Sequence, residues 1–521
     1  MKELIFHRAF LPAIDRYASK VMVQDGDHQG TFAEHGDRVL RLADAMRRQL
    51  GLTAADRFAV MAANSHQFLE LYHAGFLGAG IINPLNLRLA TKELQFVLAD
   101  SGTKVVFVDA LFADHVVRAI DEVRADLVVE HVVVIGDTEG AHDVGYEDLV
   151  AAGSPVVPSE PDEDDPVVLM YTGGTTGVPK GVLLDQRAEL LNLYHIAVAL
   201  DFNESRVYLH QTPMFHAASM GGVLGIPAIG ATSVFVPVFD PRAVIETIER
   251  HQVDWTMMVP TMIAMVLDHP DFQPERLASL RDLVYGASPV SSALLTRLME
   301  ELPAARLWQG YGMTECSSAL TFLTAEDHRV GGARLRSAGR PVFGVNLAVQ
   351  GKDGVALSRG DIGEVCARGG NFMREYWHRP ELTDASFTDG WFHTGDEGYL
   401  DEQGYLYLVD RVKDMIVTGG ENVYSVEVEN AIASHPAVAQ VAVIGIPHEV
   451  WGEQVHAIVV TKPDAVVTAA QIQAQACESI AGFKVPKSVE FRAEALPLSG
   501  ALKVLKRDLR QPYWDKTLAA T

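Results

Sequence analysis

The sequence predicts an α/β fold in which a large N-terminal domain is followed by a small α+β C-terminal domain. In the N-terminal half, apolar residues recur at helical spacing in Phe32–Leu50 and Thr91–Asp100. Short apolar strands follow these helices at Arg57–Met61 and Lys104–Asp109. Such alternation is typical of layered α/β structures with largely parallel strands. The 521 residues are enough for more than one domain and an ample core.

The chain changes character after Asp410. A charged run, Arg411–Asp414, separates two apolar strand-like runs, and a mixture of helical and strand patterns follows it. The length of that last part is sufficient for a separate compact unit. We therefore expect an N-terminal domain over residues 1–410, a linker over 411–414 and a C-terminal domain over 415–521.

Charge and cysteine content exclude several classes of protein. Asp and Glu number 68 against 43 Lys and Arg, a net charge of −25, which argues against a nucleic-acid partner. Cys316, Cys366 and Cys477 lie far apart, so they predict neither a disulfide framework nor a zinc knuckle and fit a reducing cytosol. The uncharged stretch Gly221–Phe239 contains glycines and prolines and is expected to be a buried helix and strand. We expect a cytoplasmic protein without an integral membrane segment.

A loop rich in glycine and threonine follows the apolar strand Val167–Met170. Glycines allow backbone N–H groups to face an anion, hydroxyls donate to phosphate oxygens, and a lysine adds a positive charge. No Gly-Lys-Ser/Thr sequence leads into a helix, so this is not a Walker loop. A polyphosphate site is the functional interpretation, and a plain hairpin turn is the alternative. The loop contains Thr172, Gly173, Gly174, Thr175, Thr176, Gly177 and Lys180.

Further motifs follow along the chain. They are Gln309–Glu315, Trp391–Asp396, Asp410–Asp414 with Gly419–Tyr424, and Pro497–Arg507. In order and approximate spacing, together with the glycine- and threonine-rich loop, they resemble the adenylate-forming superfamily of acyl-CoA synthetases, peptide-synthetase adenylation domains and beetle luciferases. The resemblance extends from about Phe32 to Arg510, and motifs in register are far more specific than any single one. The segments around Arg411 and Gly419 look most like the acyl- and aryl-CoA ligase branch.

The resemblance implies an ATP-dependent acyl-CoA ligase. A carboxylic acid, expected to be a fatty acid, would react with ATP to give an acyl-AMP and pyrophosphate, and coenzyme A would then displace AMP. Because the first step brings two anions together, the site has to supply cations and donors where charge accumulates. The same resemblance implies a β-barrel-like part in the N-terminal domain, a mobile C-terminal domain, and Mg²⁺ as cofactor.

The resemblance also implies roles for individual residues around ATP. Glu315 and Thr176 would hold Mg²⁺, which prefers oxygen ligands. Asp396 and Arg411 would bind the ribose hydroxyls, and Thr314 would contact the α-phosphate. The β- and γ-phosphates would be held by Thr172, Thr175, Thr176 and Lys180 with the backbone of Gly173, Gly174 and Gly177. The adenine would lie between Tyr311, with Gly312 beside it, and the segment Gly286, Ala287 and Ser288.

Lys503 is the expected catalytic lysine of the small domain. It would bridge the attacking carboxylate and the α-phosphate, and rotation of the small domain about Lys413 would then withdraw it. Gly419 and Gly420 would let the pantetheine arm pass close to the backbone, and His216 would face the junction of acyl group and pantetheine. Small residues after His216, which include Ala217, Ala218, Ser219 and Gly221, are expected to leave volume for an acyl chain.

The sequence departs from the family pattern at two positions. Gly173 stands where a serine is frequent, and Leu502 precedes the lysine where glycine is more common, which is expected to stiffen that loop. Lys503 taken alone could be one surface cation of a basic tail, and Lys506 is the alternative for the catalytic lysine. Alternative functions are an acyl-AMP ligase that loads a carrier protein, an aryl-CoA ligase, and a non-catalytic nucleotide-binding relative. The identity of the acid and the oligomeric state stay open.

Overall fold

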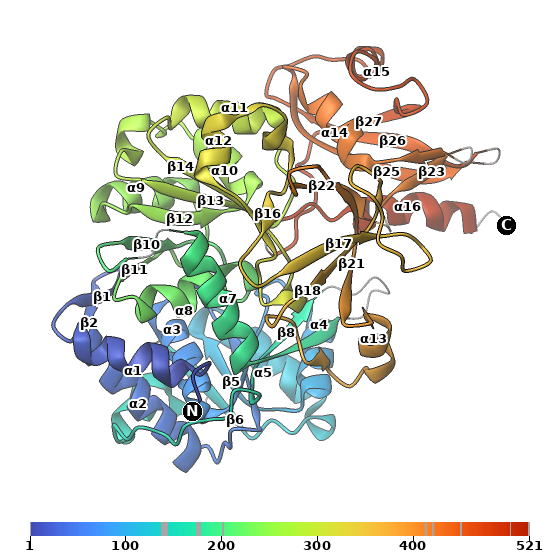
Figure 1. Cartoon of the computed structure of the whole chain (residues 1–521). Helices are drawn as coiled ribbons and strands as arrows, with labels where there is room; N and C mark the ends of the chain where they lie inside the picture. The colour runs from blue at the N-terminus through green and yellow to red at the C-terminus, as the bar shows by residue number, and fades with distance from the viewer. Residues whose placement is uncertain are drawn as a thin grey trace.

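The computed structural model describes residues 2–136, 144–172, 179–200, 203–411, 414–418, 421–448, 451–500 and 502–518. A large lobe contains most of the chain, and a smaller lobe formed by its last part packs beside it (Figure 1). The α-helices of the large lobe are α1 (Phe6–Arg16), α2 (Phe32–Arg48), α3 (His66–Ala74), α4 (Thr91–Ser101), α5 (Ala113–Glu122), α6 (Tyr146–Ala152), α7 (Gln186–Ala199), α8 (Met220–Ala228), α9 (Pro241–His251), α10 (Pro260–Leu267), α11 (Ser292–Glu301), α12 (Ala325–Val330) and α13 (Pro380–Ala385). Those of the small lobe are α14 (Ser425–Ala433), α15 (Ala469–Cys477) and α16 (Lys506–Leu518).

One sheet of the large lobe carries the glycine-rich segments of the middle of the chain. Its central strands are parallel, and antiparallel strands close both edges. The strand order is β16 (Arg340–Pro341), β15 (Thr321–Leu323), β14 (Arg306–Tyr311), β13 (Asp282–Gly286), β12 (Trp255–Met258), β10 (Val207–His210), β11 (Thr232–Phe235), β1 (Val21–Asp25) and β2 (His28–Thr31).

A second sheet carries the glycine- and threonine-rich loop. The parallel strands β4, β3, β5 and β6 lie at its centre, and β8 and β9 form an antiparallel hairpin whose connection contains that loop. The strand order is β19 (Glu375–Tyr376), β9 (Lys180–Asp185), β8 (Pro166–Thr172), β4 (Ile81–Pro84), β3 (Arg57–Met61), β5 (Thr103–Asp109), β6 (His131–Ile135) and β7 (Val144–Gly145).

The main apolar core joins these two sheets. It includes Val60 of β3 and Phe235 of β11, with Leu42 of α2, Phe68 of α3 and Val223 of α8 packed in the same buried cluster. Helices α2, α3 and α8 therefore cover both sheets. The packing of these helices between the two sheets fixes the relative positions of the strand ends. Ligands of α/β folds bind beyond the carboxyl ends of parallel strands.

An antiparallel sheet links the large lobe to the small one. The hairpin expected over residues 347–367 is β17 (Asn346–Gln350) with β18 (Gly363–Arg368), and the turn at Glu402–Gly404 joins β21 (Trp391–Leu400) to β22 (Leu406–Arg411). Strand β20 (Phe387–Thr388) completes the sheet. The expected β-barrel-like part corresponds to this region.

The small lobe has its own sheet and cores, as an independent unit should. Two apolar clusters cover the sheet, one beneath α14 and α15 and one beneath α16. The strands are β24 (Glu421–Val423), β23 (Ile416–Thr418), β26 (Gly452–Thr461) and β25 (Val438–His448), with β27 (Ser488–Arg492) parallel to β26. The sequence predicted the α+β character of this part but treated its end, with Lys506, Arg507 and Arg510, as a basic tail, whereas Lys506–Leu518 forms α16.

Candidate active site

A cleft of about 2700 Å³ lies where the two lobes meet. Its walls contain Thr172, Tyr311 and Asp396 from the large lobe and Glu427 and Lys503 from the small lobe. Thr172 and Tyr311 end β8 and β14, Asp396 lies within β21, Glu427 is on α14, and Lys503 is in a turn before α16. The structure therefore brings the separated sequence motifs to one place.

Lys180, Glu315 and Tyr376 form a compact polar group on one wall of the cleft. The Lys180 Nζ lies 3.1 Å from Glu315 Oε1 and donates a hydrogen bond of 2.7 Å to the Tyr376 hydroxyl. That hydroxyl in turn donates to Glu315 Oε1 at 2.7 Å. Burial and the charge of Glu315 hold the pKa of Tyr376 well above its usual range, so the phenol stays a donor. The group thus joins a lysine, a carboxylate and a phenol in a largely buried position.

Thr172 ends β8 directly beside this group, since it pairs with Lys180 across the hairpin. Within the described residues, its hydroxyl oxygen is buried and has no hydrogen-bond partner. A buried hydroxyl of this kind requires a polar partner, and a phosphate oxygen would supply one. The other predicted members of the loop, Gly173, Gly174, Thr175, Thr176 and Gly177, lie outside the described residues.

Tyr311 and Asp396 form a second polar pair. The Tyr311 hydroxyl donates to Asp396 Oδ2 at 2.7 Å, and Asp396 is only 6% exposed. Burial and the neighbouring carboxylate hold the pKa of Tyr311 well above its usual range. The bond fixes the orientation of the carboxylate. Arg411 pairs with Asp396 through the backbone of β21 and β22, but its side chain lies outside the described part of the structure.

The backbone around the expected adenine site is unusually close-packed. A Cβ at Gly286, where φ is +154°, would lie 2.1 Å from the Gly310 carbonyl oxygen, and one at Gly312 would lie 1.9 Å from that of Ser318. Only glycine fits these two positions. Ala287 has a φ of +63°, a conformation that costs an L-residue about 1–2 kcal/mol. Ala287 and Ser288 line the cleft, as does Tyr311.

The turn that carries Lys503 enters the cleft from the small lobe. Leu498 and Val504 form an isolated bridge at its base, and the Lys503 N–H donates to Ser499 Oγ at 3.1 Å. The Arg88 guanidinium of the large lobe donates to the carbonyl oxygens of Leu498 and Ser499 at 3.0 and 3.2 Å. The large lobe thus holds the turn through its backbone.

Two neighbours of Lys503 fit the turn tightly against the large lobe. A Cβ at Gly500 would lie 2.2 Å from Asn86 Oδ1, so no side chain fits between the turn and Asn86. Leu502 packs against an apolar cluster that also contains Trp308 and Phe322 of the large lobe. Leu502 has a φ of +57°, which is why glycine is favoured at such a position.

Lys503 and Lys506 have different surroundings. Lys506 Nζ lies 2.7 Å from Glu429 and donates to the Ser425 hydroxyl at 2.6 Å, both on α14 of its own lobe. Lys503 instead lies close enough to His216 of the large lobe for its charge to influence that imidazole. The geometry favours Lys503 over Lys506 as the lysine that reaches across the cleft.

His216 faces the part of the cleft that the sequence assigns to the acyl group. Burial, with a smaller contribution from Lys503, lowers the pKa of His216 to about 3, so the imidazole is neutral near pH 7. Ala217, Ala218 and Gly221 line the cleft beside it. Ser219 is buried and donates to the carbonyl oxygens of Met214 and His216, so it does not widen the pocket.

Three residues of the site were not found by the sequence analysis. Tyr376 lies 196 positions from Lys180, which it contacts, and no pattern of neighbouring residues predicts such a contact. Asn86 and Arg88 follow the carboxyl end of β4, where the topology of parallel sheets concentrates ligand-binding residues. That rule could have singled them out. Lys413, Gly419 and Gly420, by contrast, lie outside the described residues.

Two protein-family models match most of this chain. Residues 10–377 match the AMP-binding enzyme family, and residues 427–503 match the AMP-binding enzyme C-terminal domain. The chain belongs to the AMP-binding enzyme family. A feruloyl-CoA synthase of an Amycolatopsis species is 36% identical over 502 residues, which cover 94% of this chain and 95% of the relative. The long-chain-fatty-acid–CoA ligase FadD13 of Mycobacterium tuberculosis is 36% identical over 490 residues and 94% of both chains.

Solved structures agree with this assignment. ATP-bound MatB from Rhodopseudomonas palustris is 29% identical, covers 98% of this chain and 99% of its own, and superposes with a TM-score of 0.88. The apo form of the same protein, 30% identical with 99% of both chains covered, gives 0.78. This AMP-binding enzyme therefore superposes better on the ATP-bound form than on the apo form. The expected superfamily, α/β fold and enzyme class are confirmed: the chain is an AMP-forming, ATP-dependent acid–CoA ligase.

Over the described ranges, none of the helices combines the length and apolar character that crossing a bilayer requires.

Proposed function

We propose that this ligase adenylates an apolar carboxylic acid with Lys503 as the cation that enters the cleft, and then passes the acyl group to coenzyme A. The observation that carries the proposal is that Lys503 lines the same cleft as Lys180, Glu315 and Asp396 although it belongs to the other lobe. A cation that arrives with the small lobe can neutralise the two anions only while the lobes are closed. The same lysine can leave before the thiol reacts.

Each group has a task in the first step. Attack of the carboxylate on the α-phosphate forms an acyl–phosphate bond and breaks the bond to pyrophosphate, so negative charge shifts to the leaving group. Lys180 and the Thr172 hydroxyl would hold that leaving group, and Lys503 would contact the reacting oxygens. Asp396, oriented by Tyr311, would accept hydrogen bonds from the ribose. Preorganised donors of this kind typically contribute about 10²–10³-fold in rate.

The donor set fits a magnesium ion. Glu315 offers a buried carboxylate, close to the buried Thr172 hydroxyl that would bind a phosphate oxygen. Oxygen ligands suit Mg²⁺, which would offset the phosphate charge when bound. Lys180 now pairs with Glu315, and it would turn toward a phosphate when the ion takes the carboxylate. Thr176, the other predicted ligand, lies outside the described residues.

The acyl end of the cleft favours an apolar acid. Ile196, Leu200, Phe215, Trp255 and Met257 line it, and apolar walls of this kind bind hydrocarbon or aryl groups. Gly221 does not open as much space as the sequence suggested, because a Cβ there would already lie 3.1 Å from Ile196. We propose a fatty acid as the substrate class, with an aryl acid as the alternative.

An acid panel tests this proposal. Purified enzyme with ATP, Mg²⁺ and coenzyme A is offered straight-chain acids of increasing length, arylpropenoic acids and polar dicarboxylic acids, and pyrophosphate release is measured. We expect release with the apolar acids and none with the dicarboxylic acids. Preference for dicarboxylic acids would overturn the assignment of the pocket. Replacing coenzyme A by a holo-carrier protein distinguishes the carrier-loading alternative, which predicts faster transfer to the carrier.

A further inference from the structure

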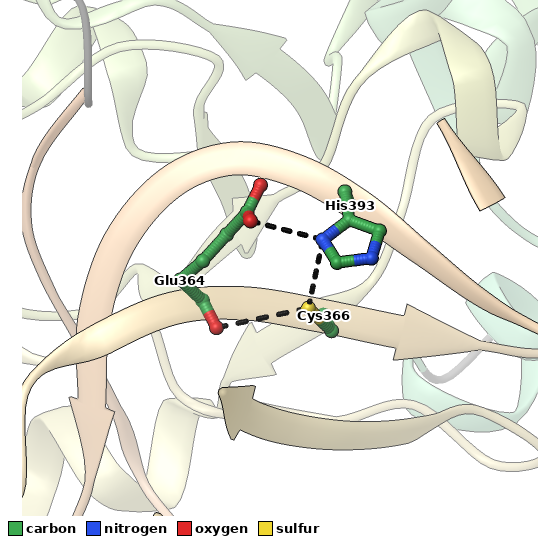
Figure 2. A group of neighbouring side chains, drawn as sticks. All are labelled: Glu364, Cys366 and His393. Carbon is green, nitrogen blue, oxygen red and sulfur yellow. Dashed lines mark hydrogen bonds and ion pairs between the residues drawn. The ribbon is translucent and has the colours of Figure 1, made fainter. Parts of the chain in front are cut away.

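Three side chains capable of binding a metal converge between β18 and β21. Glu364 and Cys366 project from β18 and His393 from β21, and Figure 2 shows all three turned toward one another. His393 Nδ1 lies 2.9 Å from Glu364 Oε2 and 3.5 Å from Cys366 Sγ. One ligand atom from each residue lies within 4.8 Å of the other two. The sequence analysis gave these residues no common role.

The spacing resembles that of a tetrahedral metal site. Zinc binds nitrogen at about 2.0–2.1 Å and sulfur at about 2.3 Å, so a tetrahedral angle places the two atoms about 3.5 Å apart. Cys366 Sγ and His393 Nδ1 already have that separation. Glu364 Oε2 now makes a hydrogen bond to the same nitrogen and would have to retreat by about half an ångström to become a ligand. A carboxylate on a flexible side chain can make that change.

The backbone holds the three positions in place. Cys366 is the register partner of His393 in the antiparallel β18–β21 ladder, and Glu364 is the partner of Glu397. The ladder shifts its register between Glu364 and Cys366. Residues two positions apart on a strand face the same side of the sheet, so Glu364 and Cys366 both face His393 (Figure 2).

The chemistry of the three ligands selects a particular class of ion. A thiolate and an imidazole favour borderline ions such as Zn²⁺ and Co²⁺ over Mg²⁺ and Ca²⁺, which prefer oxygen. A thiolate and a carboxylate together carry two negative charges, which would neutralise a divalent ion in a site where Cys366 is fully buried. The group is therefore chemically distinct from the Glu315 region.

The site opens toward the large cleft. Glu364 and His393 line the cleft, whereas Cys366 lies behind them. Three protein ligands leave the fourth tetrahedral position to water or to another small ligand. The second carboxylate oxygen of Glu364 accepts the Gly395 N–H at 3.1 Å, which ties the cluster to the segment that leads into Asp396. An ion could enter from the cleft without unfolding the sheet.

We propose that Glu364, Cys366 and His393 form a binding site for one Zn²⁺-class ion, with an open coordination position facing the cleft. On binding, the Cys366 thiol gives its proton to solvent and the sulfur bonds to the ion. The His393 proton moves from Nδ1 to Nε2, a nitrogen that is buried without a hydrogen-bond partner among the described residues. The site is separate from the predicted Mg²⁺ site and requires no substrate.

Cobalt is a suitable probe because its absorption reports both geometry and ligands. The full chain is titrated with Co²⁺ in excess Mg²⁺, which occupies hard-cation sites. We expect one equivalent to produce a thiolate-to-cobalt charge-transfer band in the near ultraviolet and visible bands of tetrahedral intensity. Zn²⁺ should then abolish both. Absence of the charge-transfer band in the folded wild-type protein would overturn the proposal.

Variants assign the signal to these residues. Cys366→Ser should lose the charge-transfer band, and Glu364→Gln should keep the band but bind Co²⁺ at least ten times more weakly. Cys477→Ser, which changes an exposed cysteine, is the matched control and should titrate like the wild type. Retention of the band in a folded Cys366→Ser variant, or its loss in Cys477→Ser, would contradict the assignment.

A Glu315→Gln variant separates this site from the proposed catalytic function. It should bind Co²⁺ with unchanged stoichiometry and affinity even if adenylation is lost. A changed Co²⁺ affinity in that variant would mean that the ion binds in the Glu315 region, and the proposal would fail. Since the measurement uses no acid, ATP or coenzyme A, its outcome does not depend on the proposed reaction.

Discussion

The two sides of the cleft are held together in different ways. On the large-lobe side, Lys180, Glu315 and Tyr376 contact one another through largely buried side chains. Breaking a buried ion pair typically costs about 3–5 kcal/mol. On the small-lobe side, the turn before α16 is held by hydrogen bonds from Arg88 to carbonyl oxygens and by Leu502. Ordinary hydrogen bonds contribute about 0.5–1.5 kcal/mol each, so we expect the contacts on the small-lobe side to break more readily than those on the large-lobe side.

The largest expected effect comes from removing the cation that the small lobe brings. Lys503→Ala should lower the rate of adenylation by about 10²–10³-fold, because a donor aimed at developing charge is lost. Thioester formation from synthetic acyl-AMP should be largely retained, since the lysine has then left the cleft. Acid-dependent exchange of pyrophosphate into ATP and the thioester step are measured separately.

Lys506→Ala is the matched control for Lys503→Ala. Lys506 is paired with Glu429 inside the small lobe, so its loss should change stability slightly and leave both half-reactions close to wild type. If Lys506→Ala lost adenylation as strongly as Lys503→Ala, the contrast between the two lysines would be wrong. Equal loss of both half-reactions in a folded Lys503→Ala variant would also contradict the specific role of Lys503 in adenylation.

The next largest effect concerns the large-lobe side. Asp396→Asn removes a charge that would accept two ribose hydrogen bonds, each worth about 1.5–3 kcal/mol when one partner is charged. We expect the KM for ATP to rise about 10–100-fold with little change in the KM for the acid. Tyr311→Phe keeps the carboxylate but removes its 2.7 Å donor, and it should raise the KM for ATP only several-fold. A larger effect of Tyr311→Phe than of Asp396→Asn would show that the Tyr311 hydroxyl, rather than the charge of Asp396, dominates ATP binding.

Sequence reasoning succeeded where the signal is local. The apolar run Val167–Met170 predicted β8, and the helical spacing in Phe32–Leu50 predicted α2, which begins with a capping box between Thr31 and Glu34. Both signals depend on neighbours in the chain. The motifs also predicted that Glu315, Asp396 and Lys503 belong to one site, and all three line the same cleft. Their chemical roles remain predictions.

The failures have physical reasons. The basic residues near the end of the chain were treated as a tail because polar residues and Pro512 obscure the helical pattern, yet Leu509 and Tyr513 pack α16 on the small-lobe sheet. Arg88 binds carbonyl oxygens, which every residue has, so its partners leave no trace in the sequence. Contacts between distant segments depend on the assembled sheets.

The buried histidine His210 should make the folded protein less stable at acidic pH. Burial lowers the pKa of His210 to about 3, whereas in the unfolded chain it is about 6.5. Between these values the unfolded chain binds the additional proton, so the free energy of unfolding should fall as pH decreases from 6.5 toward 3, by about 1.4 kcal/mol per pH unit for this histidine. It should be independent of this group above pH 6.5.

His210→Gln isolates that contribution. His210 contacts the Ser233 hydroxyl at 3.1 Å and stacks on Phe235, and glutamine retains a polar group without a proton to gain. Denaturant unfolding of both proteins at several pH values gives the difference in slope. Equal slopes for the variant and the wild type below pH 6.5 would mean that His210 is protonated in the folded protein.

The smallest expected effect concerns Leu502, which contributes to the small-lobe side in two opposing ways. Its side chain packs on the large lobe only while the lobes are closed, and its φ of +57° is unfavourable for leucine. Leu502→Ala removes part of a packing energy that reaches about 1.5–3 kcal/mol for a fully buried leucine. Because the side chain is only partly buried, we expect adenylation to slow about fivefold, with thioester formation unchanged.

Leu502→Gly distinguishes packing from backbone strain. The turn is closed by hydrogen bonds within the small lobe, from Leu502 N–H and Lys503 N–H to Ser499, so its left-handed residue should persist whether or not the lobes are closed. Relief of strain would then stabilise both arrangements equally, and Leu502→Gly should slow adenylation as much as Leu502→Ala. If glycine instead restored or exceeded the wild-type rate, the strained backbone would control closure, and the contacts made by the leucine side chain would not.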